Sequence, residues 1–107
     1  MRREALKGHL DLLLLAVVAP GPTHGYAVIE ELRRASGYVF DLPEGTIYPA
    51  LHRLERAGFL ASEWSTNEGR RRRVYSLTDR GREALDAQRQ EWQAFAGAMQ
   101  LVLRGAT

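Results

Sequence analysis

Four consecutive arginines, Arg70–Arg73, form the densest group of charge in the 107-residue chain. Arginine makes planar, two-pronged contacts with phosphate groups and with guanine edges. A second group of polar and basic side chains consists of His52, Arg53 and Arg56. Both groups suit DNA: the arginine run can bind phosphates, and the second group can reach phosphates or base edges.

The composition excludes several kinds of chemistry. The chain has no cysteine, which rules out disulfides, thiolate metal sites and cysteine nucleophiles. The three histidines, His9, His24 and His52, share no clear face with a pair of carboxylates, so we expect no metal. No glycine-rich phosphate loop and no Ser/His/Asp arrangement occurs. We therefore predict neither an enzyme nor a bound cofactor.

The balance of residue types is that of a folded protein, with 45% hydrophobic and 26% charged residues. Basic residues outnumber acidic ones by 15 to 13, for a net charge of +2. The longest apolar run, Leu12–Ala19, is much shorter than the about 20 residues that a membrane-spanning helix needs. We expect a cytoplasmic protein with no membrane partner.

Glycine and proline residues divide the chain into five expected segments. They are helices over residues 5–19, 24–35 and 43–57, a two-stranded hairpin with strands at 59–65 and 70–77, and a long helix over 78–104. Thr23 and Thr78 are the expected N-caps of the second and last helices. The hairpin turn is expected at residues 66–69. This organisation predicts a fold that is mainly α with a small β-hairpin.

The expected helix over residues 43–57 is amphipathic. Ile47, Leu51 and Leu54 recur at the spacing of one buried helical face. The opposite face is polar, basic and aromatic, with Tyr48 at its shoulder. The other members of this opposite face are Thr46, Pro49, His52, Arg53 and Arg56.

Apolar residues of the last helix recur at spacings of three and four, as in a seam that packs against a partner helix. The first helix is apolar nearly all round and needs cover on more than one face, which a second subunit could supply. We therefore expect a homodimer. Its interface residues would be Leu10, Leu13, Leu14, Leu85, Trp92, Phe95, Met99 and Val102.

Three helices, a hairpin and a long helix, in this order, predict a winged helix-turn-helix followed by a C-terminal dimerisation helix. In this fold a recognition helix enters the major groove and the hairpin, or wing, touches the flanking backbone. We expect a single domain over residues 1–107, with the winged helix-turn-helix at 5–77 and the dimerisation helix at 78–104.

Three segments resemble the signature motifs of PadR-type transcriptional regulators. Residues 23–29, THGYAVI, resemble the family's HGYxI motif. Residues 45–55, GTIYPALHRLE, resemble its GTLYPALHRLE recognition helix, and residues 69–78, GRRRRVYSLT, resemble its GRRRRYYxLT wing. The three segments follow the family order and spacing, and the resemblance covers nearly the whole chain.

The resemblance implies a homodimeric, sequence-specific DNA-binding repressor of the short subgroup with one C-terminal dimerisation helix. It would bind double-stranded DNA at a pseudo-palindromic operator, and an unidentified small hydrophobic inducer would release it. By this likeness His24 and Tyr26 would lie near the DNA backbone. The full set of expected DNA-binding residues is His24, Tyr26, Thr46, Tyr48, Pro49, His52, Arg53, Arg56, Arg70, Arg71, Arg72 and Arg73.

Two alternative functions stay open. In multidrug-sensing members of the family, a tryptophan that aligns with Trp92 stacks on planar drugs in a pore between the subunits. The pore lining here would be Leu12, Trp92, Ala96 and Met99, whereas the plainer interpretation makes Trp92 part of the dimer core. The other alternative is a winged helix that contacts a protein and has no operator.

Overall fold

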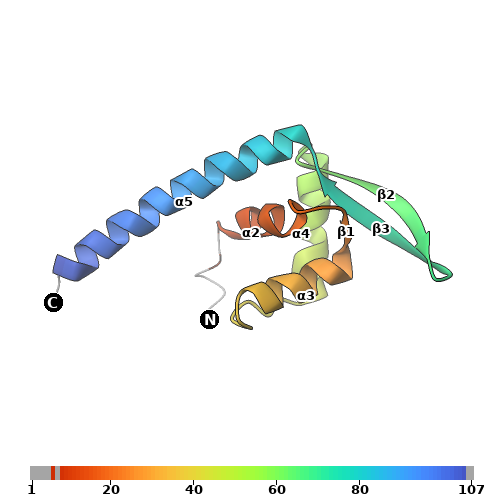
Figure 1. The fold of residues 1–107 in the computed structure, drawn as a ribbon, viewed down its shortest axis with the longest axis horizontal. Helices are drawn as coiled ribbons and strands as arrows, with labels where there is room; N and C mark the ends of the chain where they lie inside the picture. Colours follow the sequence, from red (N-terminus) through yellow and green to blue (C-terminus); the bar gives the residue numbers. More distant parts are fainter. Residues whose placement is uncertain (1–5, 7, 106–107) are drawn as a thin grey trace.

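The computed structural model describes residue 6 and residues 8–105 of the chain. Figure 1 shows a body of short helices from which a long helix and a β-hairpin extend. The elements in chain order are α2 (Leu10–Val18), β1 (Thr23–His24), α3 (Gly25–Ala35), α4 (Glu44–Arg56), β2 (Leu60–Asn67), β3 (Arg70–Leu77) and α5 (Asp79–Gly105). The predicted fold, mainly α with a small β-hairpin, is confirmed.

α2 lies at the centre of the core because apolar side chains cover more than one of its faces. Leu14, Leu15 and Val18 are buried. α3 and α4 each bury one apolar stripe, as the sequence predicted for both helices. The buried residues of these two stripes are Val28, Ile29, Leu32, Ile47, Ala50, Leu51 and Leu54.

α2 is shorter than the helix predicted over residues 5–19. Gly8 has a φ of +87°, a left-handed conformation that a right-handed helix cannot continue through, and α2 begins at Leu10. Residues 5 and 7 of the predicted helix lie outside the described residues. The predicted start of this helix was wrong because the spacing of apolar residues does not reveal a left-handed backbone conformation at a glycine.

The sheet has three antiparallel strands in the order β1-β3-β2, where two strands were predicted. Thr23 pairs with Tyr75, and His24 pairs with Val74. α3 begins at Gly25, so its N-cap is His24 rather than the predicted Thr23. The Nδ1 of His24 accepts a hydrogen bond from the backbone N–H of Ala27 at 3.3 Å. The beginning of α3 is therefore joined to the hairpin.

β2 and β3 form the wing, whose strands are paired as far as Asn67 and Arg70. Glu68 and Gly69 alone connect them, in place of the predicted four-residue turn. Both residues have positive φ angles, 53° and 74°, which matches a type I′ turn and the right-handed twist of a hairpin.

α5 begins as predicted, with Thr78 as its N-cap. The hydroxyl of Thr78 accepts a hydrogen bond from the N–H of Gly81 at 3.0 Å and donates one to the carbonyl of Gly58 at 2.7 Å. A Cβ on Gly81 would lie 2.0 Å from the carbonyl oxygen of Phe59, so this crossing requires a glycine. These contacts fix the first turns of α5 to the segment that follows α4.

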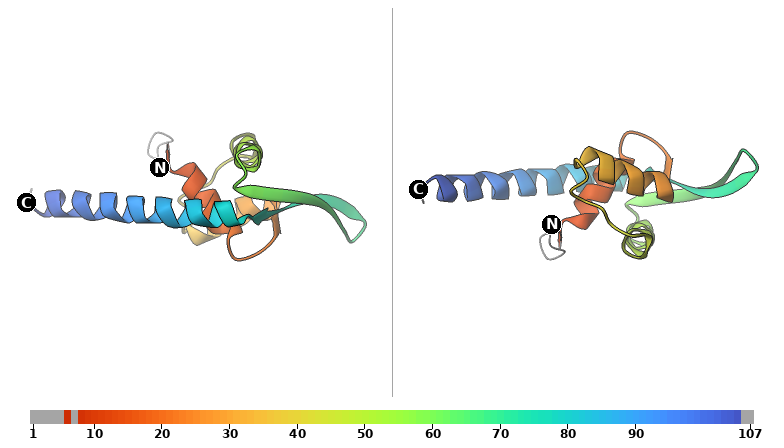
Figure 2. Two further views of the ribbon diagram at one scale, coloured as in Figure 1. Left: turned by 90° about the horizontal axis from the view of Figure 1, so that it is seen from above. Right: turned by 90° about the horizontal axis from the view of Figure 1, so that it is seen from below.

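The rest of α5 extends away from the body. Its 27 residues span about 40 Å, and the whole molecule is 58 Å long. Figure 2 shows α5 and the wing extending in opposite directions from the other helices. Among the described residues, no helix combines enough length and apolar character to cross a membrane.

Two residues expected at a dimer interface lie instead in the core of the single chain. Leu14 is 0% exposed and Leu85 is 2% exposed, so neither has surface left for a partner. The apolar pattern did not separate residues that cover their own core from residues that face a second chain. The other expected interface residues have free surface: Leu10 and Leu13 are half-buried, and Trp92, Phe95, Met99 and Val102 are exposed.

Candidate nucleic-acid interface

α4 presents a polar and basic face to solvent. Its buried stripe fixes the rotation of the helix and turns the opposite face, which was predicted to read DNA, away from the core. Glu44 lies in the first turn, where the helix dipole favours a negative charge. The exposed residues of the outer face are Pro49, His52, Arg53 and Arg56, and the half-buried ones are Thr46 and Tyr48.

Tyr48 packs against the first residue of α3. A Cβ built on Gly25 would lie 2.3 Å from Cε1 of Tyr48, so the close approach of α3 and α4 requires a glycine at this position. Burial raises the pKa of the Tyr48 phenol, and the nearby Glu44 carboxylate raises it further. The phenol is therefore neutral at physiological pH and can donate a hydrogen bond.

His24 connects the beginning of α3 to the wing. Its Nδ1 faces the N–H of Ala27, and its Nε2 lies 2.8 Å from Nη1 of Arg72. Both neighbours carry N–H groups; a neutral imidazole has one lone pair and accepts from one of them, whereas a protonated imidazole accepts from neither. Burial lowers the pKa of His24, and the positive charge of Arg72 lowers it further. The neutral ring is therefore the form that can keep the hydrogen bond from the N–H of Ala27.

Arg71 and Arg73 lie against Trp64 on the face of the wing that adjoins α4. Their guanidinium carbons are 4.7 and 5.3 Å from the centroid of the indole, within the range of cation–π contacts. Arg73 also donates from Nε to the hydroxyl of Ser62 at 2.8 Å, and that hydroxyl donates to Glu55 of α4 at 2.5 Å. This chain of contacts ties the wing to α4.

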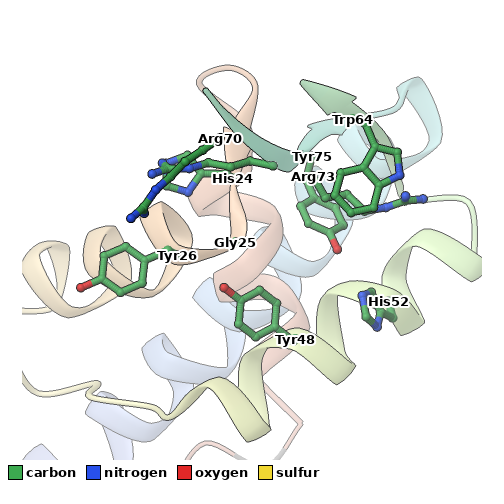
Figure 3. Close-up of a pocket in the computed structure, with 10 residues that line it drawn as sticks. His24, Gly25, Tyr26, Tyr48, His52, Trp64, Arg70, Arg73 and Tyr75 are labelled. Carbon is green, nitrogen blue, oxygen red and sulfur yellow. The ribbon is translucent and has the colours of Figure 1, made fainter. Parts of the chain in front are cut away.

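A cleft of about 690 Å³ lies between α4, the beginning of α3 and the wing. Figure 3 shows Tyr48 and His52 on its helical side and Trp64 and Arg73 on its strand side. Cationic groups beside aromatic rings suit the phosphates and sugars of a nucleic acid. The residues that line the cleft are His24, Gly25, Tyr26, Tyr48, His52, Trp64, Arg70, Arg72, Arg73 and Tyr75.

The cleft brings together most of the predicted DNA-binding residues but not all of them. Thr46, Pro49 and Arg56 lie on α4 outside its lining. Arg71 lies over Trp64, and Arg53 forms an ion pair with Asp11 of α2. In the described part of the chain, no group of three or more His, Cys, Asp or Glu side chains could hold a metal ion.

Sequence reasoning missed three residues of the cleft, Gly25, Trp64 and Tyr75, and the ion-pair partner of Arg53. Trp64 was assigned to a strand without a role, although a large aromatic residue among polar neighbours, opposite an arginine run, was a usable signal. Gly25 carries no side chain, so its packing role has no signal in a single sequence. Asp11 pairs with a residue 42 positions away, a contact that local spacing cannot reveal.

The comparison with known families decides the identity of the fold and its class of function. The family described as "Transcriptional regulator PadR-like family" matches residues 14–87, from the core of α2 into α5. The chain belongs to the PadR-like family of transcriptional regulators. As a PadR-like regulator it is not an enzyme, in agreement with the prediction from the sequence.

Individual relatives agree with this assignment. The chain is 38% identical over 94 residues to the transcriptional regulator Rv3488 of Mycobacterium tuberculosis, covering 88% of this chain and 85% of the relative. A PadR family regulator from Clostridium difficile has a TM-score of 0.81 and 32% identity, covering 90% of this chain and 99% of that one.

A PadR family regulator from Eggerthella lenta has a TM-score of 0.82 and 30% identity, covering 94% of this chain and 86% of that one. The predicted family and the predicted winged helix-turn-helix are both confirmed.

Proposed function

We propose that this PadR-like protein is a cytoplasmic, homodimeric repressor that binds a pseudo-palindromic site on double-stranded DNA. The observation that carries the proposal is the position of the cationic, aromatic cleft directly beside the solvent-exposed face of α4. A duplex whose major groove holds α4 has its backbone within reach of the cleft, because Tyr48 and His52 belong to both surfaces.

The outer face of α4 and the wing have different roles in DNA recognition. His52 and Arg56 on α4 reach base edges or the adjacent phosphates in the major groove, and Pro49 offers apolar contact to thymine methyl groups. Arg70 and Arg72 at the wing neutralise phosphates and supply affinity that does not depend on sequence. Contacts from the wing to phosphates therefore position the protein on DNA, whereas contacts from α4 to base edges select the DNA sequence.

The exposed half of α5 supports the dimer. Trp92 is 46% exposed, Phe95 58% and Val102 72%, although all three are large and apolar. Burying them against a second copy is favourable at about 25 cal/mol per Å² of apolar surface. Paired α5 helices place two α4 helices in successive major grooves, roughly 34–36 Å apart. An inducer that changes the angle between the subunits releases the DNA.

Fluorescence anisotropy with a labelled duplex tests this function. The duplex covers the DNA immediately upstream of the protein's own gene, and a shuffled duplex of the same composition is the control. We expect tighter binding to the upstream duplex, with an affinity that falls steeply as salt is raised. Undetectable binding at low salt would instead favour a winged helix that contacts a protein.

A ligand-sensing function is the second candidate, and a second cleft favours it. This cleft of about 480 Å³ lies between the beginning of α2 and the middle of α5. Its lining includes Leu12, Trp92, Phe95, Asp11 and Glu91, while Ala96 and Met99 lie farther along α5. An indole beside carboxylates suits a planar cation. Quenching of Trp92 fluorescence by planar cationic compounds would support this function, and no response to a broad panel would count against it.

A further inference from the structure

Trp64 is a large, exposed aromatic residue in the middle of the wing. It is 53% exposed and pairs with Arg73 in the register of β2 and β3. Opposed residues of an antiparallel pair share a face, so Trp64 lies on the face that carries Ser62, Arg71 and the buried Tyr75. The core ends at Tyr75, and Trp64 lies beyond it, at the wall of the cleft.

Two arginines of β3, on the same face of the wing as Trp64, hold the indole in place. Arg71 and Arg73 both lie within cation–π distance of the ring, and Arg73 is itself fixed by its hydrogen bond to Ser62. The ring is therefore partly ordered before any partner arrives. A partner that binds it loses less side-chain entropy than it would with a freely rotating residue.

The surroundings of the indole select the chemistry of its partner. Two guanidinium groups beside the ring repel a cation and attract an anion. The ring itself offers a broad apolar surface and one N–H donor. A strand of DNA carries both complementary parts, because apolar deoxyribose rings alternate with phosphates.

We propose that Trp64 packs against a deoxyribose of a DNA backbone that lies along the cleft, and that it forms a non-ionic contact of the wing. This inference rests on the proposed DNA binding and adds a contact that the basic residues do not provide. Affinity from this contact does not depend on counterion release, unlike the affinity from Arg71.

Acrylamide quenching of Trp64 fluorescence tests the contact directly. The chain has two tryptophans, so Trp92→Phe leaves Trp64 as the only indole, and Trp64→Phe is the matched control that leaves Trp92. With saturating upstream duplex, we expect the quenching constant of Trp64 to fall by about twofold or more, because DNA covers its exposed face. An unchanged constant in a complex whose formation is confirmed by anisotropy overturns the inference alone. A wild-type protein that binds no duplex overturns the proposed function as well.

The salt dependence of affinity separates a direct contact from a scaffold for the arginines. We expect Trp64→Ala to weaken binding by about tenfold with an unchanged salt slope. Arg71→Ala should lower the slope by ~0.9, the loss of one phosphate contact. A flattened slope in Trp64→Ala would mean that the indole acts only through the arginines, which overturns the contact. Circular dichroism checks folding, and Trp64→Phe replaces Trp64→Ala if the latter unfolds.

Discussion

The guanidinium of Arg53, on the outer face of α4, forms an ion pair with the carboxylate of Asp11 at the beginning of α2. Asp11 also lines the cleft between α2 and α5 that contains Trp92. One side chain therefore links the face proposed to read DNA with the region proposed to form the dimer and to accept a ligand. Both partners are partly exposed, so the pair contributes only about 0–1 kcal/mol to folding.

Replacing Asp11 tests this link. In Asp11→Asn, Arg53 loses its partner and becomes available to phosphates, so we expect affinity for a shuffled duplex to rise by about two- to fivefold. The preference for the upstream duplex over the shuffled one should fall. Glu91→Gln is the matched control, because it removes the same charge from the same cleft. Equal effects of the two variants in anisotropy titrations would contradict a specific role for the pair.

Substitutions in the wing should change overall DNA affinity, whereas substitutions in α4 should change the preference among DNA sequences. Arg70→Ala should weaken binding to all duplexes alike and flatten the salt slope by ~0.9, because a phosphate contact carries no sequence information. His52→Ala should instead change the ranking of operator variants that differ by one base pair, with differences of about 1–3 kcal/mol per position. Competition titrations over such a set check both. If Arg70→Ala changed the ranking of operator variants and His52→Ala did not, the roles assigned to the wing and to α4 would be reversed.

Gly25→Ala should impair DNA binding more than folding. The new Cβ would lie 2.3 Å from the Tyr48 ring, and the ring must move away from α3. The displaced ring changes the shape of the cleft that Tyr48 lines, so we expect the affinity for DNA to fall by about tenfold or more. Gly45→Ala is the control, because its Cβ has no neighbour within 4 Å. Similar affinities for Gly25→Ala and the wild type would show that the cleft tolerates the movement.

Gly81→Ala should destabilise the protein severely. Its Cβ would meet the backbone carbonyl of Phe59 at 2.0 Å, and a backbone atom cannot turn aside as a side chain can. We expect the free energy of unfolding to fall by about 3 kcal/mol. In the same helix, Gly97→Ala has open space and should raise stability by up to about 1 kcal/mol. Urea denaturation compares the two, and a stable Gly81→Ala variant would contradict the packing at this crossing.

His24 should make stability dependent on pH below neutrality. The pKa of His24 in the folded protein is lower than its ordinary value of 6.5, so the unfolded chain binds the proton more readily. The stabilisation is fully present above pH 6.5 and is lost as the pH falls through the lowered pKa. His24→Asn keeps a good N-cap without a titrating ring. Its melting temperature should fall less than that of the wild type between pH 7.5 and 5, and equal decreases would contradict this role.

The elements that depend on local spacing could be predicted from the sequence. The apolar stripes of α3 and α4 follow helical periodicity, and Thr78 is a residue type that caps helices well. The stripe of α4 also predicted which of its side chains face solvent. The outer face of α4 could therefore be identified from the sequence alone.

The parts that depend on distant neighbours could not be predicted in this way. β1 has only two residues and exists because β3, about fifty positions later, pairs with it. Leu85 resembles the later residues of its helix in type and spacing, yet it covers the chain's own core. The contact between Arg72 and His24 could not be predicted either, because the two residues are 48 positions apart in the sequence and meet only in the folded sheet.

The number of protein chains on one duplex distinguishes a dimeric DNA-binding protein from a monomeric one, because the proposed function requires two copies of the α4 face on one duplex. Native mass spectrometry of the protein with the upstream duplex measures it. We expect a complex of two protein chains per duplex. Trp92→Glu should convert it to weak single-chain binding, because it places a charge on the exposed seam of α5. A single chain bound to the duplex in the wild type, or no complex at low salt, would contradict the proposed dimeric DNA binding.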